Sequence, residues 1–230
     1  MTHQNVQNCM IKLITGVLLM AVTTLAGEVQ FPAQDGGVVY ADVYGAGPRG
    51  VVLAHGARFD KASWKKEATE LAEAGFRVVA IDFRGYGKSH GGPNAKPGYD
   101  DLYMDVLAAV HYLRENGATS VAVVGASMGG GASANAVVKG KAGEIDRLVL
   151  LAHAPIEAPE RITGPKLFIT SADDPIAPKV REQYAKAPEP KELQVLDGSA
   201  HAQFLFAGVH RERVIGEIVR FLGGRSAAAH

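Results

Sequence analysis

The sequence predicts an α/β fold: a mostly parallel sheet of eight strands, flanked by helices, in a single domain. From Glu28 onward, short apolar runs of β type alternate with amphipathic runs of helical period, the pattern typical of α/β proteins. The chain of 230 residues, 47% of them hydrophobic, is long enough for one sizeable core and short for two domains.

The first two strands are expected over 29–33 and 38–44. Between them lies Gln-Asp-Gly-Gly at 34–37, a turn sequence that favours an antiparallel hairpin at the edge of the sheet. The third strand, 51–54, is apolar throughout, as a strand buried on both faces should be.

Crossover helices are expected over 61–75 and 99–117, because apolar side chains recur every three or four positions in both. A strand over 76–83 follows the first helix. The segment 84–98 is rich in glycine and proline, which predicts a loop before the second helix.

The remaining strands are expected over 121–124, 148–152, 166–170 and 193–196, with helices near 176–187 and 211–222 and a small-residue helix after Ser127. Only about a dozen residues separate the strands that start at Leu148 and Lys166, too few for an inserted lid. We therefore expect no cap domain and an open site.

One serine lies on a sharp turn between a strand and a helix. The sequence Gly125-Ala126-Ser127-Met128-Gly129 follows an apolar strand, and glycines two positions before and after the serine allow the backbone to turn tightly. Such a turn projects the hydroxyl above the end of the sheet, which indicates a catalytic nucleophile.

Other reactive side chains also follow predicted strands. Asp173 and Asp174 come after the strand of 166–170, and His201 comes after the strand of 193–196, with His210 as a fallback histidine. Because ligands bind at the carboxyl ends of strands in open α/β sheets, we expect the serine, one aspartate and the histidine to meet there.

These motifs together resemble the α/β-hydrolase superfamily, close to its small, lidless serine esterases and dienelactone-hydrolase-like proteins. The resemblance covers 29–222 and rests on His55-Gly56, Asp-Phe-Arg-Gly-Tyr-Gly-Lys-Ser at 82–89, the serine turn, Asp-Pro-Ile-Ala-Pro at 174–178, and the late histidine. The chain departs from lipases in having Ala57-Arg58 where a Gly-Gly pair would follow, and from dienelactone hydrolases in having serine in place of a cysteine nucleophile.

The resemblance implies a catalytic triad of Ser127, His201 and Asp174. The histidine would take the serine's proton, and the carboxylate would orient the imidazole. Asp174 fits the register of the family's acid motif better than its rival Asp173. The backbone N–H of Met128, after the serine, and by resemblance that of Ala57 would form the oxyanion hole.

Two further residues are candidates for the substrate pocket. Arg58 follows the expected oxyanion turn and would attract an acidic group, although pairing with Asp60 on the surface is the alternative. His153 lies at a strand end, where it would line the pocket or pack in the core. We expect His55 to hold the oxyanion turn by hydrogen bonds rather than to act as a base.

The predicted function is hydrolysis of carboxylic esters, with short acyl chains, through an acyl-serine intermediate. An open site without a lid offers little apolar wall to bury a long chain. Thioester or amide hydrolysis by the same triad, and a non-catalytic ligand-binding homologue, are the alternatives.

Composition excludes several other classes. The 24 basic and 24 acidic residues cancel without a basic stripe, so we expect no nucleic-acid partner, only a small-molecule ester. No cofactor is expected, because Gly85-Tyr86-Gly87 lacks the further glycine of a dinucleotide site, and no spacing suggests a metal site. The single cysteine, Cys9, excludes an intramolecular disulfide. Oligomeric state is not determined by the sequence.

Residues 1–26 are expected to be a signal peptide, because an apolar stretch after Lys12 ends in the small-x-small pattern Thr24-Leu25-Ala26. Export to the periplasm or medium would follow. An uncleaved helix packed on a cytoplasmic domain is the alternative, since about thirteen residues are too few to span a membrane and no stable anchor is expected. The hydrolase domain would cover 28–224, with 225–230 as a tail.

Overall fold

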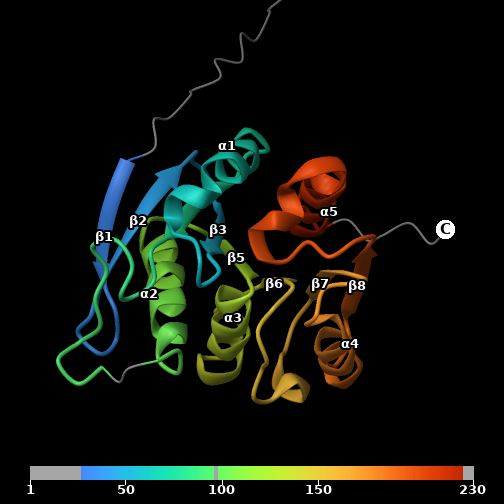
Figure 1. Cartoon of the computed structure of the whole chain (residues 1–230). Coiled ribbons are helices and arrows are strands. Elements are labelled where there is room, and N and C mark those ends of the chain that lie inside the picture. The colour runs from blue at the N-terminus through green and yellow to red at the C-terminus, as the bar shows by residue number, and fades with distance from the viewer. Residues whose placement is uncertain (1–26, 96–97, 225–230) are drawn as a thin grey trace, which may run out of the picture.

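The computed structural model describes residues 27–95 and 98–224, which form one eight-stranded sheet with helices on both faces (Figure 1). The strand order is β1-β2-β4-β3-β5-β6-β7-β8. The strands are β1 (Gly27–Pro32), β2 (Val38–Tyr44), β3 (Arg49–Ala54), β4 (Arg77–Ile81), β5 (Ser120–Ala126), β6 (Arg147–Leu151), β7 (Lys166–Ser171) and β8 (Lys191–Leu196). β2 pairs antiparallel with β1 and β4, and every other neighbouring pair is parallel. The predicted fold class is confirmed.

The predicted hairpin at the sheet edge is also confirmed. β1 and β2 pair in antiparallel register from Gly27 opposite Val43 to Pro32 opposite Val38. In the turn between them, Gly36 has a φ of +81°, a left-handed conformation that glycine adopts without steric cost.

Two layers of helices sandwich the sheet. α1 (Lys65–Glu73) and α5 (Arg211–Leu222) cover one face, and α2 (Leu102–Glu115), α3 (Met128–Lys139) and α4 (Ala177–Lys186) cover the other (Figure 1). Successive side chains of a strand point to opposite faces. Within β3, Val51 and Leu53 therefore pack in the α1–α5 core, and Val52 and Ala54 in the core beneath α2 and α3.

The first predicted helix is interrupted. The expected segment 61–75 consists of a 3₁₀ turn, Lys61–Trp64, followed by α1. The carboxylate of Asp60 caps the turn by accepting hydrogen bonds from the N–H groups of Ala62 and Ser63. This tighter turn carries the Trp64 side chain into the core, where it is fully buried.

Arg84 holds the long loop after β4 against the rest of the domain. Its guanidinium lies 2.7 Å from the buried carboxylate of Asp105 on α2 and 2.6 Å from Asp35 in the β1–β2 turn. The backbone N–H of Arg84 also donates to Asp105 at 2.9 Å. The loop is thereby tied to a helix and to the hairpin.

No cap domain is inserted between β6 and β7. The fully described segment 152–165 contains a single three-residue 3₁₀ turn, Pro159–Arg161. Across 27–95 and 98–224, no helix combines the length and apolar character needed to cross a bilayer. The expected signal segment 1–26, the tail 225–230 and Cys9 lie outside the described residues, so those expectations remain predictions.

Candidate active site

Three polar side chains from three strand ends meet at the carboxyl edge of the sheet. Ser127 follows β5, Asp174 follows β7, and His201 follows β8. Nε2 of His201 lies 2.8 Å from Oγ of Ser127, and Nδ1 of the same ring lies 2.7 Å from Oδ2 of Asp174. With the imidazole neutral, Nδ1–H donates to the carboxylate and the serine hydroxyl donates to Nε2. These distances form a continuous hydrogen-bonded chain from carboxylate to hydroxyl.

The Ser127 backbone adopts an unusual conformation, with φ of +48° and ψ of −115°. Residues other than glycine rarely adopt positive φ, and they persist there only when the surroundings hold them. Here the N–H of Ser127 donates to Leu151 O at 2.9 Å, while its carbonyl accepts from Ala154 N–H and Gly131 N–H. The turn is therefore fixed from β6 and from α3.

The glycines on either side of Ser127 are required by close packing. A Cβ on Gly129 would lie 2.3 Å from the carbonyl oxygen of Ala54 and 2.6 Å from that of His55. A Cβ on Gly125 would lie 2.4 Å from Gly129 O and 2.4 Å from the Ser133 hydroxyl. Gly129 thus allows the start of α3 to approach the end of β3, and Gly125 allows the same helix to pack closely on β5.

The buried aspartate is the one that contacts the histidine. Asp174 is almost fully buried, and its second oxygen, Oδ1, accepts from Ile176 N–H at 3.1 Å. Its rival Asp173 is exposed. The fallback His210 ends a 3₁₀ turn, Gly208–His210, and hydrogen-bonds to neither Ser127 nor Asp174.

Two backbone N–H groups, on the turns that follow β3 and β5, are free to donate to a ligand. Within the described chain, the amides of Ala57 and Met128 donate to no protein acceptor. Tyr86 links the two positions, since its hydroxyl donates to Ala57 O at 2.8 Å and lies 3.8 Å from the Met128 sulfur. Met128 is also the first residue of α3, where the helix dipole favours negative charge.

His55 holds the turn that carries Ala57, as expected for a structural histidine. Its Nε2 accepts from Phe83 N–H at 3.2 Å, which leaves the proton on Nδ1 to bond Gly56 O at 2.8 Å. The ring packs edge-on against Phe83 and Tyr86. Burial lowers the pKa of His55, which keeps the ring neutral and suits this pair of bonds.

Sequence reasoning missed Gln203, which connects two loops of the site. Its side-chain oxygen accepts from Gly56 N–H at 3.2 Å, and its side-chain nitrogen donates to the Ser63 hydroxyl at 3.0 Å. The residue is buried two positions after His201. Its place next to a candidate catalytic histidine was the only sequence signal for it.

The two pocket candidates differ in their surroundings. Arg58 is exposed and lines an open cavity of about 520 Å³ with Ala57 and Tyr86. Within the described part of the chain, Arg58 forms no ion pair with Asp60. His153 is fully buried against Phe168, so the expectation that it lines an open pocket is not supported. The turn after β6 directs its ring into the core.

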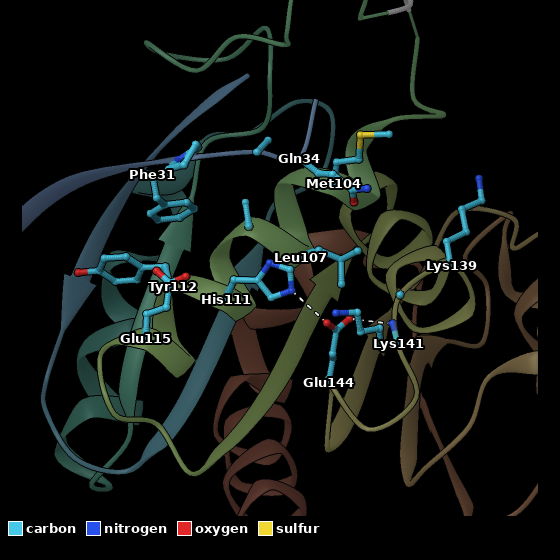
Figure 2. Close-up of a pocket in the computed structure, with 14 residues that line it drawn as sticks. Phe31, Gln34, Met104, Leu107, His111, Tyr112, Glu115, Lys139, Lys141 and Glu144 are labelled. Atoms are coloured by element: carbon cyan, nitrogen blue, oxygen red, sulfur yellow. Dashed lines mark hydrogen bonds and ion pairs between the residues drawn. The ribbon is translucent and has the colours of Figure 1, made fainter. Parts of the chain in front are cut away.

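A second hollow lies away from these groups, over the outer side of α2 (Figure 2). This groove of about 590 Å³ runs between the end of β1 and the segment after α3. Among the residues that line it, Nε2 of His111 lies 3.1 Å from a side-chain oxygen of Glu144. None of its lining residues belongs to the Ser127 site, so the groove is separate from that site.

The donor set of the Ser127 site suits acyl transfer rather than metal binding. No group of three histidine, cysteine or carboxylate side chains within 27–95 and 98–224 is arranged to hold a metal ion. A hydroxyl, an imidazole, a buried carboxylate and two free amides are the groups that nucleophilic attack on a carbonyl requires.

The fold and this arrangement at the strand ends define an α/β hydrolase. Residues 47–159 match the family described as serine aminopeptidase, S33. The putative protein-lysine deacylase ABHD14B of Rattus norvegicus is 30% identical over 164 residues, which cover 67% of this chain and 75% of that protein. The chain belongs to the α/β-hydrolase superfamily.

Other similarities are shorter or structural. The AB hydrolase superfamily protein YisY of Bacillus subtilis is 30% identical over 106 residues, 46% of this chain and 38% of the relative. This and three other curated relatives are matched over only 15 to 43% of their length. The esterase EaEST from Exiguobacterium antarcticum superposes with a TM-score of 0.72 at 17% identity, over 86% of this chain and all of that chain, a likeness of fold.

Proposed function

We propose that the protein hydrolyses carboxylic esters through an acyl-serine intermediate. The observation that carries this proposal is the hydrogen-bonded chain from Asp174 through His201 to Ser127, with distances of 2.7 and 2.8 Å. The same hydrogen-bonded arrangement of carboxylate, imidazole and hydroxyl activates serine as a nucleophile on unrelated folds.

In the first half-reaction, Oγ of Ser127 attacks the ester carbonyl carbon while its proton passes to Nε2 of His201. The carbonyl oxygen becomes an oxyanion that accepts hydrogen bonds from the N–H groups of Met128 and Ala57. The tetrahedral intermediate then collapses: the bond to the alcohol oxygen breaks, and His201 returns the proton to that oxygen. Each such oxyanion donor stabilises the transition state by about 3 kcal/mol.

In the second half-reaction, water replaces the alcohol. His201 takes a proton from the water as its oxygen attacks the acyl carbon, and then gives that proton to Oγ of Ser127 as the carboxylic acid leaves. Asp174 stays ionised throughout and stabilises the imidazolium that forms in each step.

The acyl part of the substrate is short in this proposal. No cap covers the site at 152–165, and the His201 side chain is 41% exposed. An open surface buries less of each added methylene, and each buried methylene contributes about 0.8 kcal/mol. Rates on a series of ethyl esters with increasing acyl length test this point, and a preference for long chains would contradict it.

Amide hydrolysis is the second candidate, favoured by similarity to a relative named as a protein-lysine deacylase. The same serine, histidine and oxyanion amides would serve it. An acetyl-lysine peptide beside ethyl acetate in one assay separates the two reactions. Thioester hydrolysis with the same triad, and a ligand-binding protein with a silent triad, are the remaining alternatives.

The deciding experiment is covalent labelling with a fluorophosphonate together with ester turnover. Wild-type protein is expected to form an adduct on Ser127 and to hydrolyse ethyl acetate, and Ser127→Ala should do neither. Ser199→Ala, an exposed serine two residues before His201, serves as the matched control and should keep both activities. A folded wild-type protein that forms no adduct would contradict the proposal.

Two sequence-based expectations accompany this proposal. Arg58 attracts an anionic group of the substrate, since its guanidinium is exposed and has no partner in the described chain. The protein is exported after removal of residues 1–26. Mass spectrometry of the natural N-terminus tests export. The role of Arg58 is tested by the ratio of the rates on monomethyl succinate, which is anionic, and methyl butyrate, which is neutral. This ratio should fall in Arg58→Gln relative to wild type.

A further inference from the structure

We propose that Phe59 and Phe204 bind the alcohol part of the ester, and that this alcohol is aromatic. The inference rests on the proposed function and adds the class of substrate to it. It starts from two rings at the Ser127 site that the hydrolytic steps leave without a role.

The two rings form an aromatic pair in which Phe59 is half-buried and Phe204 is exposed. Their centroids lie 5.2 Å apart at an interplanar angle of 65°, an edge-to-face contact. Phe204 is 53% exposed, and Tyr99 and Val209 are the only other large hydrophobic side chains exposed to this degree in the described part of the chain. Among the described residues, Tyr99 and Phe204 are the exposed aromatic side chains, and Phe204 lies three positions after the candidate catalytic His201.

Both rings are carried by the loops that form the site. Phe59 N–H donates to Gly56 O at 3.0 Å, in the turn that presents Ala57. Phe204 N–H donates to His201 O at 3.0 Å. Gln203 joins the two loops by its bond to Gly56. The aromatic pair therefore spans the oxyanion turn and the histidine loop.

The chemistry assigns this surface to the alcohol rather than the acyl group. His201 must deliver its proton to the departing alcohol oxygen, so that oxygen has to lie within hydrogen-bonding distance of Nε2. The alcohol is then on the histidine side of the reacting carbon. Phe204 lies on the 3₁₀ turn Ala202–Phe206 that directly follows His201.

The adjoining space suits a planar ring. Phe59 and Tyr86 both line the open cavity of about 520 Å³ beside Ala57. Aromatic rings pack favourably in offset or edge-to-face arrangements, so a third ring can extend the existing pair. A small alkyl alcohol would leave this surface uncovered.

The test compares three acetates that share an acyl group: benzyl, cyclohexylmethyl and ethyl acetate. The wild type should hydrolyse benzyl acetate with the highest kcat/KM. Phe204→Leu should lower kcat/KM about three- to tenfold more for benzyl acetate than for ethyl acetate, mainly through KM. Phe204→Tyr keeps the ring and should keep the preference. Val209→Ala removes another exposed apolar side chain and should have no effect.

Equal losses on all three esters, or a wild type with no preference for benzyl acetate, would overturn the inference while leaving ester hydrolysis intact. Binding to the inactive Ser127→Ala variant separates the inference from the reaction. Benzyl acetate titrated into that variant should shift the NMR signals of the Phe59 and Phe204 rings, and cyclohexylmethyl acetate should do so less. An absence of shifts at both rings would overturn the aromatic site even if the protein were no hydrolase.

Discussion

The side-chain oxygen of Gln203 accepts a hydrogen bond from the backbone N–H of Gly56 at 3.2 Å, across 147 residues of sequence. This bond joins the turn after β3, which presents the Ala57 amide, to the loop after β8, which presents His201. The amide that would stabilise the oxyanion and the base that would move the proton are therefore positioned by one side chain.

Gln203→Met should lower kcat for ester hydrolysis about tenfold or more with little change in KM. Methionine fills a similar volume but leaves the buried Gly56 N–H without an acceptor, which typically costs about 1–3 kcal/mol. The turn then relaxes away from the geometry the oxyanion needs. Steady-state kinetics on ethyl acetate give the split between kcat and KM.

Ser63→Ala is the matched control for Gln203→Met. It removes the outer hydrogen bond of Gln203, together with the bond from the Ser63 hydroxyl to Asp60 O, and leaves the bond to Gly56 in place. A loss of kcat as large as that of Gln203→Met would show that Gln203 acts through Ser63 and not through the oxyanion turn.

Gly129→Ala should reduce activity about a hundredfold, because displacements near 1 Å in a catalytic site have effects of this size. The new methyl group would meet the carbonyl oxygens of Ala54 and His55 and push the end of β3 away from Ser127. The measurement is kcat/KM together with urea unfolding.

Gly216→Ala serves as the control glycine. It lies on the exposed side of α5 with open space around it, and the alanine should raise stability by up to about 1 kcal/mol without changing activity. Full activity in Gly129→Ala would disprove the packing argument.

Acid should destabilise the protein partly through His153. Burial lowers the pKa of this histidine to about 4 from its ordinary value near 6.5. Between these values the unfolded chain binds a proton that the folded protein does not, so stability is present above pH 6.5 and falls as pH drops towards 4. The loss from this one residue amounts to about 3 kcal/mol.

Urea unfolding of wild type and His153→Leu at several pH values between 4 and 7 tests this linkage. The variant should lose less stability than the wild type over that range, whatever its stability at pH 7. Replacing the exposed His90 by glutamine controls for the removal of a histidine. Parallel pH profiles for wild type and His153→Leu would contradict the prediction.

Asp105→Asn should destabilise the fold by about 3 kcal/mol, because it removes the charge that faces the buried guanidinium of Arg84. Asp35 alone would remain as the partner of that cation. Thermal and urea unfolding measure the effect. Glu182→Gln breaks a surface pair with Lys179 and Lys186 and should change stability little. Equal effects of the two substitutions would rule out a special role for the buried pair.

Much of this architecture was predictable because its signals are local. The Gln-Asp-Gly-Gly turn indicated the edge hairpin, and unbroken apolar runs such as Val51–Leu53 indicated buried strands. The glycines around Ser127, together with the apolar strand before it, indicated a candidate nucleophile on a sharp turn. Once the strands were placed, His201 and one of the two aspartates, Asp173 or Asp174, followed from the rule that ligand groups gather at the carboxyl ends of parallel strands, and the resemblance to α/β hydrolases favoured Asp174.

Features that depend on packing between distant segments were beyond the sequence. Gln203 contacts Gly56 and Ser63, neither of which marks it by pattern or spacing. The burial of His153 depends on the direction of the chain after β6, where Ala152 has a φ of +42°. The 3₁₀ turn before α1 forms because Asp60 caps it and because it carries the Trp64 side chain into the core. These two contacts override the helical periodicity of the sequence over 61–75.

The proposed nucleophile follows a central strand of the sheet, whereas its base follows an edge strand. β5, which leads to Ser127, is hydrogen-bonded to strands on both sides, whereas β8, which leads to His201, is the outermost strand and is held by β7 alone. Peripheral strands open more readily than central ones when a protein is warmed or exposed to mild denaturant. Turnover should therefore disappear while most of the sheet is still intact, and it should return last on refolding. Catalysis is thus a sensitive measure of the opening of β8 from β7.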